Sequence, residues 1–224
     1  MAGVPTGKPS AEARRPASTW LIITCLTLLA LFGLDALASR MLSLSALDLP
    51  LERVAQTTNW GPLSAFMDLT NWSGGWPQAL LGTAAAGGLL AWRWASGLRL
   101  MLASAASGWD SLLKVALHRP RPSPELVHVG QVNAGFSFPS GHAVFFTWLA
   151  VMLAAALAAG RGRTVQALIW SGAIAVPLLA ALGRVWAGAH WPTDVAGGIL
   201  FALAWCCLVH AVRLPPFLLR PPRH

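Results

Sequence analysis

Charged residues are scarce in this sequence. Only 11% of the 224 residues are charged and 55% are hydrophobic, whereas a soluble domain carries about a quarter charged residues. Acids are the rarer sign, with 8 Asp and Glu against 16 Lys and Arg. This composition excludes an ordinary soluble domain and predicts one compact membrane-embedded bundle rather than two domains.

Cysteine is almost absent, and the chain has no tyrosine. The three cysteines, Cys25, Cys206 and Cys207, lie inside apolar runs without a CxxC or paired histidines, which argues against a disulfide framework or a zinc site. The 12 tryptophans are interpreted as interface anchors and packing groups. We therefore expect no nucleic-acid partner, and we interpret the net charge of +8 through membrane topology.

Six long apolar runs are predicted to cross a membrane. A helix needs about 20 apolar residues to span a hydrocarbon core of roughly 30 Å. The predicted spans are residues 20–39, 76–92, 98–117, 140–159, 164–183 and 192–212. Residues 51–58 and 62–70 are too short to cross and are predicted to lie at the interface. The expected fold class is an all-α membrane protein, a six-helix transmembrane bundle with short interfacial helices between spans one and two.

Basic residues predict the orientation of this bundle. Six spans put both termini on one side, and with that side cytoplasmic it holds 10 of the 16 Lys and Arg: Lys8, Arg14, Arg15, Arg93, Arg99, Arg161, Arg163, Arg213, Arg220 and Arg223. Such a bias marks the cytoplasmic side. We expect a bacterial-type inner-membrane protein with a flexible cytoplasmic tail at 1–17, a six-span domain at 18–213 and a second cytoplasmic tail at 214–224. A cleaved signal peptide is the alternative for the first run, but it lacks a small-x-small cleavage site.

Three polar junctions interrupt the apolar pattern, each where a long run begins or ends. In the expected topology all three face outward, so segments separated by up to 80 residues can form one site at the periplasmic surface. The first junction holds Lys114 and Arg121, the second Ser140, Gly141 and His142, and the third Arg184, His190 and Asp194.

These residue types favour phosphate chemistry. Three cations repel one another unless an anion lies among them, and arginine forks and helix N-termini both bind phosphate oxygens. A neutral histidine such as His190 can attack phosphorus when its other nitrogen is held, here by Asp194 four residues later. His142 can protonate the leaving oxygen. We expect Asp194 and Glu125 to be the only acids near the junctions, so we expect no metal and no cofactor, with cations balancing the transition-state charge.

The joint pattern Lys114-x6-Arg121-Pro122, Pro139-Ser140-Gly141-His142 and Arg184-x5-His190-x3-Asp194 resembles the signature of the type 2 phosphatidic acid phosphatase (PAP2) superfamily. The motifs cover residues 114–194, and the six-span layout is similar over most of the chain. The third motif of the family usually begins Ser-Arg, whereas this chain has Gly183 before the arginine. The resemblance implies a metal-independent mechanism with the following roles: His190 as the nucleophile that forms a phosphohistidine, His142 as general acid, Asp194 as the group that orients His190, and Lys114, Arg121, Arg184, Ser140 and the Gly141 amide as phosphate ligands.

Four motif residues also have an interpretation without function. Ser140 suits a helix N-cap, and an acid such as Asp194 is favourable in a first helical turn. Lys114 could snorkel to the interface, and Arg121 could be a solvated loop charge.

Three neighbours of the motifs have separate interpretations. Asp110 lies four residues before Lys114, so we predict that the two pair. Asp110 remains an accessory site candidate, because acids inside spans are usually functional. His118 and Arg119 match no family position and are interpreted as loop residues.

The predicted function is a membrane lipid phosphatase that hydrolyses a phosphomonoester or pyrophosphate on the outer face. Its expected partners are membrane lipids and a lipid phosphate: undecaprenyl pyrophosphate, which is slightly favoured, phosphatidylglycerol phosphate, phosphatidic acid, diacylglycerol pyrophosphate or lipid A phosphates. A phosphotransferase using the same phosphohistidine is the main alternative. A vanadium haloperoxidase is disfavoured because those chains are soluble, and a transporter because charge clusters at one end of the spans. The oligomeric state is not indicated.

Overall fold

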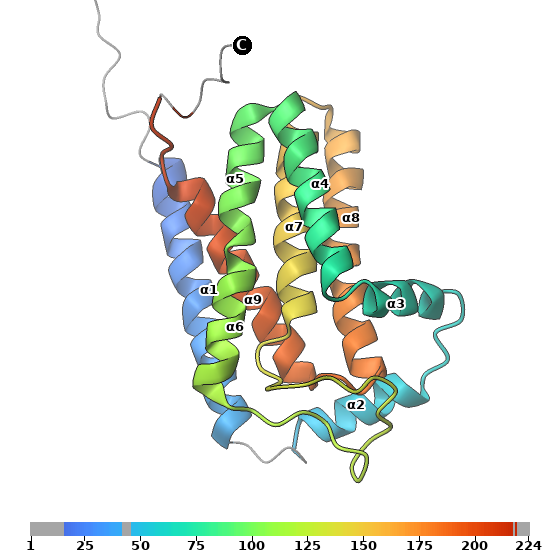
Figure 1. Ribbon diagram of the computed structural model, residues 1–224. Coiled ribbons are helices and arrows are strands. Elements are labelled where there is room, and N and C mark those ends of the chain that lie inside the picture. The colour runs from blue at the N-terminus through green and yellow to red at the C-terminus, as the bar shows by residue number, and fades with distance from the viewer. Residues whose placement is uncertain (1–15, 42–45, 217, 219–224) are drawn as a thin grey trace, which may run out of the picture.

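The apolar runs form helices throughout the part of the chain that the computed structural model describes, residues 16–41, 46–216 and 218 (Figure 1). The predicted tails at 1–17 and 214–224 lie largely outside these residues, and the predicted domain division stays a prediction. Nine helices occur within the described ranges: α1 (Pro16–Met41), α2 (Asp48–Thr57), α3 (Leu63–Trp72), α4 (Trp76–Trp92), α5 (Trp94–Ser104), α6 (Ala106–Leu117), α7 (Gly141–Ala158), α8 (Arg163–Trp186) and α9 (Pro192–Ala211).

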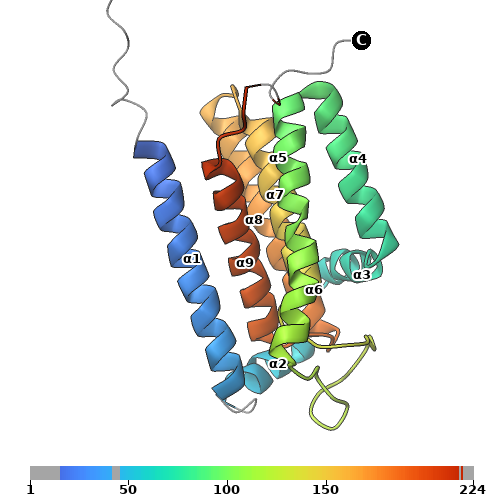
Figure 2. The ribbon, with the colours of Figure 1, turned by 60° about the vertical axis from the view of Figure 1, so that its left-hand side comes forward.

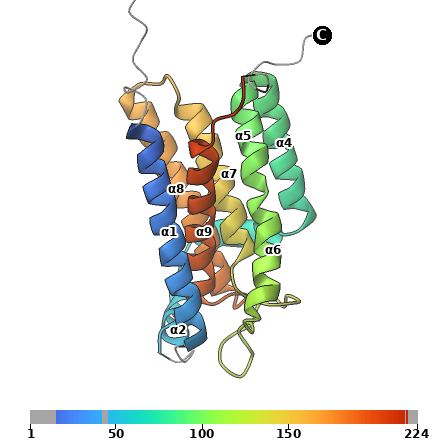
Figure 3. The same cartoon turned by 90° about the vertical axis from the view of Figure 1, so that its left-hand side faces the viewer.

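Four of the described helices are long and apolar enough to cross a membrane, namely α1 from Thr19, α7, α8 and α9. The helix α4 has 17 residues, and the predicted span 98–117 is divided between α5 with 11 residues and α6 with 12. Only Ala105 separates α5 from α6, and α6 continues in the direction of α5 (Figures 1 and 3). The predicted six-span count is therefore not confirmed by helix length and composition alone.

The helix α2 turns its polar side inward. Asp48, Glu52 and Ala55 are buried, while Leu51 and Val54 on the other side are exposed. Large apolar side chains are also exposed along α1, α4 and α8. Exposed apolar surface of this extent is unfavourable in water and favourable against lipid, so the surface of the bundle agrees with a membrane protein.

The buried core surrounds α7. Its side chains pack with those of α5 and α9, including Val144, Trp148, Phe201 and Ala202. The helix α1 lies along α9 on the outside of this core (Figure 2). Small residues allow close packing at the start of α9, because a Cβ on Gly198 would lie 2.8 Å from the Ser140 carbonyl oxygen. The start of α7 and the start of α9 are thereby held against each other.

All three polar junctions lie at one end of the bundle. The end of α6, the start of α7, the end of α8 and the start of α9 meet at the end opposite the described C-terminal residues (Figures 1 and 3). The helix α2 and the loop 118–140 lie across this same end. The predicted meeting of junctions that are distant in sequence is therefore present in the fold.

Candidate active site

His190 lies in the tight turn between α8 and α9. Gly188 has a positive φ of 65°, and a Cβ there would lie 2.1 Å from the His128 carbonyl oxygen, so only glycine fits. The turn leaves the imidazole 3% exposed. Burial, followed by the charges of three cations at the junctions, lowers the pKa of His190 well below its usual value, so the ring is neutral at neutral pH.

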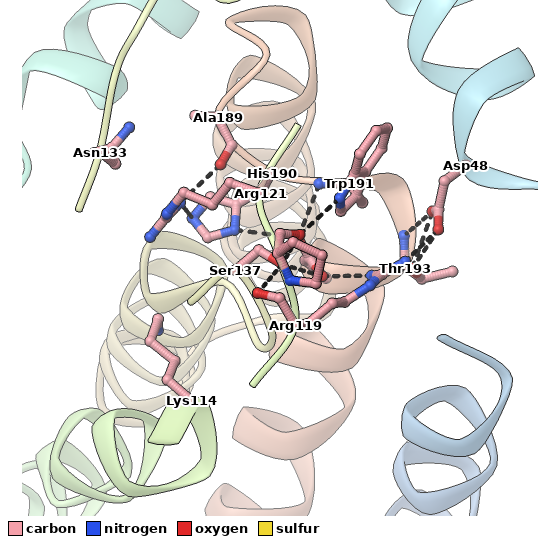
Figure 4. Close-up of polar contacts among 12 residues, drawn as sticks. Asp48, Lys114, Arg119, Arg121, Asn133, Ser137, Ala189, His190, Trp191 and Thr193 are labelled. Carbon is pink, nitrogen blue, oxygen red and sulfur yellow. Dashed lines mark hydrogen bonds and ion pairs between the residues drawn. The ribbon is translucent and has the colours of Figure 1, made fainter. Parts of the chain in front are cut away.

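The two ring nitrogens of His190 face different partners (Figure 4). Nε2 lies 3.1 Å from Nη1 of Arg121, and Nδ1 lies 3.5 Å from Oδ2 of Asp194. A guanidinium only donates hydrogen bonds, so Nε2 is the acceptor and the proton belongs on Nδ1. This tautomer directs the lone pair of Nε2 toward Arg121, as a nucleophile that attacks bound phosphate requires.

Asp194 is fully buried in the first turn of α9. Its Oδ2 accepts a 2.9 Å hydrogen bond from the Trp191 backbone N–H, which fixes the start of the helix. Its backbone carbonyl accepts a 2.9 Å bond from the Ser140 N–H. The third junction is thereby joined directly to the second.

The predicted phosphate ligands Lys114, Arg121 and Arg184 lie near enough to His190 for their charges to lower its pKa, and Arg121 is in direct contact with the ring. The Nη1 of Arg121 donates to the Ala189 carbonyl at 2.7 Å, and burial lowers the pKa of Arg121 from its ordinary value. Arg184 is 1% exposed and donates to two carboxamide oxygens, those of Gln131 and Asn71.

Lys114 forms an ion pair with Asp110, as the i,i+4 spacing predicts. The pair lies against the start of α7, where a Cβ on Gly141 would be 2.8 Å from Oδ2 of Asp110 and 3.4 Å from Nζ of Lys114. The glycine therefore allows the lysine to approach the α7 N-terminus, which is where the sequence places the phosphate cradle.

Ser140 and His142 are both placed at the start of α7. Ser140 occupies the N-cap position, but its hydroxyl makes no capping bond, so the interpretation as an ordinary N-cap side chain is wrong. Its Oγ is buried and, among the described residues, has no hydrogen-bond partner. The His142 ring packs on Gly74, where a Cβ would lie 2.9 Å from Cε1. Nε2 of His142 is likewise buried without a hydrogen-bond partner among the described residues.

The comparison with family models gives one match here, the PAP2 superfamily, over residues 92–216. The chain belongs to the PAP2 superfamily. The matched region includes all three junctions and more than half of the chain, so the resemblance carried by the motifs is confirmed. The comparison with curated proteins finds no matching sequence.

Two solved structures share the PAP2 fold of this chain. The first is the transmembrane PAP2 type phosphatidylglycerolphosphate phosphatase from Bacillus subtilis, with a TM-score of 0.69 and 23% identity over 84% of this chain and 94% of that one. The second is LpxE from Aquifex aeolicus, with a TM-score of 0.59 and 23% identity over 74% and 95% of the two chains. At this identity the similarity concerns the fold.

Arg119 lies in the loop after α6, as interpreted from the sequence, but its side chain also takes part in the site, which that interpretation missed. It is 4% exposed and binds two carboxylates, those of Asp48 at the start of α2 (Figure 4) and Asp194 at the start of α9. It also donates to Thr193 Oγ1 at 2.6 Å. Its position beside Arg121 in an Arg-Pro-Arg-Pro segment was the one available signal, but the motif spacing selects only Arg121.

Other polar residues at the PAP2 junctions had no sequence signal. The expectation that Asp194 and Glu125 are the only acids near the junctions is wrong, because α2 brings Asp48 and Glu52 beside Asp194. Burial, followed by the carboxylates of Asp194 and Asp48, raises the pKa of Glu52 to about 8. Among the residues described, no group of three or more His, Cys, Asp or Glu side chains is arranged to hold a metal ion.

Proposed function

We propose that this PAP2 protein is a metal-independent membrane lipid phosphatase that hydrolyses a lipid phosphate or pyrophosphate through a phosphohistidine on His190. One observation carries the proposal. The buried, neutral His190 ring directs Nε2 toward Arg121 and Nδ1 toward Asp194, and the charges of Lys114 and Arg184 also act on the ring. A phosphoryl group entering between the ring and the guanidinium would place phosphorus next to the nucleophilic nitrogen.

In the first step, Nε2 of His190 attacks phosphorus, forming the P–N bond while the P–O bond to the lipid breaks. His142, which becomes protonated when the anionic phosphate is bound beside it, gives its proton to the leaving oxygen. His190 then carries positive charge, which the nearby Asp194 carboxylate stabilises. Lys114, Arg121 and Arg184 balance the charge of the phosphoryl oxygens, and the Ser140 hydroxyl and Gly141 amide donate hydrogen bonds to them.

In the second step, water attacks the phosphohistidine. His142, now neutral, accepts a proton from the water, and the P–N bond breaks. Inorganic phosphate leaves, and both histidines return to their starting protonation states. A phosphotransferase would follow the same first step and replace water with another hydroxyl acceptor.

The proposal includes a location for this chemistry. We infer six membrane crossings, with α5 and α6 together forming the third, both termini cytoplasmic and the junctions at the periplasmic surface of a bacterial-type inner membrane. The bias of Lys and Arg supports this orientation. A site at the end of a bundle with a lipid-compatible surface suits a substrate whose headgroup lies at the interface and whose tail lies in the bilayer. Undecaprenyl pyrophosphate remains slightly favoured among the substrates.

The deciding experiment measures inorganic phosphate release in EDTA from a panel of detergent-solubilised lipid phosphates and pyrophosphates. We expect release by the wild type and none by His190→Ala. Reactions quenched with SDS at alkaline pH should contain a phosphorylated protein whose phosphate is stable in base and lost in acid, as in phosphohistidine. No release with any lipid, but phosphate transfer to an added alcohol, would favour the phosphotransferase. Loss of release in EDTA that returns with a divalent metal would overturn the metal-independent mechanism.

A further inference from the structure

Arg119 connects α2 to the proposed nucleophile through two buried carboxylates. Its Nη1 binds Oδ1 of Asp194 and its Nη2 binds Oδ2 of Asp48. The Arg119 and Asp48 side chains are 4% and 6% exposed, and that of Asp194 is fully buried. Removing one partner of such a buried pair leaves an uncompensated charge, so this geometry is strongly held.

Asp48 fixes the first turn of α9 from across the site. Its Oδ1 accepts 2.9 Å hydrogen bonds from both the backbone N–H and the hydroxyl of Thr193, which directly precedes Asp194. The start of α2 is therefore attached to the start of α9 by the Asp48 side chain and, through Arg119, to the Asp194 carboxylate. Figure 4 shows this chain of contacts leading from Asp48 toward the His190 ring.

The two oxygens of Asp194 have different partners. Arg119 binds Oδ1, and Ser137 Oγ donates to the same oxygen at 3.4 Å. Oδ2 accepts from the Trp191 N–H and faces Nδ1 of His190. Turning the carboxylate out of its plane would break both sets of contacts, so the guanidinium on one oxygen holds the other oxygen toward the imidazole.

We propose that Arg119 and Asp48 are positioning residues that act on His190 through Asp194. Arg119 holds the carboxylate so that Oδ2 keeps the proton of His190 on Nδ1, and Asp48 holds Arg119. This inference rests on the proposed function, in which Nε2 must keep its lone pair. Asp48 lies outside residues 92–216, which match the family model. The proposed active site therefore includes a residue beyond the matched region.

The kinetic test uses Asp48→Asn and Arg119→Lys, with Arg53→Gln as the matched control. Arg53 also lies on α2, but its side chain is exposed and donates a long 3.5 Å bond to the Leu126 carbonyl. We expect kcat to fall at least about tenfold in both site variants while KM stays within about threefold, because the phosphate ligands are unchanged. The control should keep wild-type kinetics.

A double variant separates positioning from a general loss of structure. In an Asp194→Asn background the carboxylate is already gone, so adding Arg119→Lys should lower kcat by less than about threefold more. Residues that act as a unit show this non-additivity. Full additivity of the two effects would overturn the proposal.

The second readout is the tautomer of His190, which needs no turnover. In protein labelled with ¹⁵N at histidine and assigned with His190→Ala, the wild type should show protonated Nδ1 and unprotonated Nε2. Asp48→Asn should shift the ring toward a mixture of tautomers, and Arg53→Gln should not. If the wild type releases no phosphate but the tautomer changes as expected in Asp48→Asn, the proposed function is wrong and the positioning role of Arg119 and Asp48 stands. Wild-type kcat and tautomer in both site variants, or equal loss of kcat and phosphate affinity in both, would overturn it.

Discussion

The Asn71 carboxamide joins α3 to Arg184. Its Oδ1 accepts a 3.1 Å hydrogen bond from Arg184 Nη1, and its Nδ2 donates a 3.0 Å bond to the Gly183 carbonyl. The short helix α3 therefore contacts the proposed phosphate site through Asn71. The contact is at Gly183 and Arg184, and Gly183 is the position where PAP2 chains usually carry serine. Asn71 can reach Arg184 because α3 packs closely on α8 at Gly183. A Cβ on Gly183 would lie 3.0 Å from Met67 Cβ and 3.2 Å from Met67 Cα.

We predict that Gly183→Ala weakens both stability and substrate binding. The added methyl would push Met67 and α3 away, at an overpacking cost of about 1–3 kcal/mol that exceeds the helix-propensity gain of about 1 kcal/mol. The displaced Asn71 would release Arg184 and raise KM. Gly172→Ala is the matched control on α8, since nothing lies within 4 Å of its Cβ position. Equal melting temperatures and KM values for the two variants would contradict the prediction.

A second prediction separates the roles of Asp194 and Arg184. Asp194→Asn should lower kcat about 100-fold or more with little change in KM, because the carboxylate acts on the imidazole rather than on the phosphate. Arg184→Ala should lower kcat about 100-fold and also raise KM several-fold, because a phosphate ligand is lost. Steady-state kinetics distinguishes the two. Glu125→Gln, which removes an exposed acid from the same surface, should behave as wild type, and a large KM increase in Asp194→Asn would argue against its assigned role.

The predictable part of this protein is local. Apolar runs bounded by Pro, Gly and charge predict most helix limits to within a few residues, and α4 matches residues 76–92. The break between α5 and α6 could not be predicted, because the surrounding residues 104–107 contain neither Pro nor Gly. The inward polar side of α2 was also hidden, since Asp48 and Glu52 look like ordinary surface acids until their partners are placed.

The unpredictable part of the site comes from contacts across the fold. Asp48 and Thr193 are separated by 145 positions, and Asn71 and Arg184 by 113. No periodicity or short motif links such residues. Motif spacing could identify Arg121, but it could not show that Arg119, two residues earlier, points to Asp194 instead. These are the contacts that supply positioning around a motif whose main residues are visible in the sequence.

The raised pKa of Glu52, about 8 against an ordinary 4.5, predicts a pH-dependent stability. The folded state holds this proton more tightly than the unfolded chain, so the stabilisation is complete below pH 4.5 and is lost as pH rises toward 8. Glu52→Gln mimics the protonated acid and should therefore melt higher than wild type at pH 8 and equally at pH 4.5. Glu125→Gln serves as the exposed control. A stability difference that is larger at pH 4.5 than at pH 8 would contradict the assigned direction.

If Lys114 binds phosphate as proposed, Asp110 competes with the phosphate for this lysine. Its carboxylate is paired with the lysine and lies against Gly141 at the start of α7, where a bound phosphate would seek the same cation. Asp110→Asn removes the competing charge, so inorganic phosphate should inhibit about fivefold more strongly, equivalent to about 1 kcal/mol of binding free energy. Lys114→Met should have the opposite effect, because it removes the cation and leaves Asp110 repelling the anion. Competitive inhibition constants measured in EDTA test both variants. Weaker phosphate inhibition in Asp110→Asn, matching that of Lys114→Met, would show instead that the carboxylate is needed to hold Lys114 in its binding position.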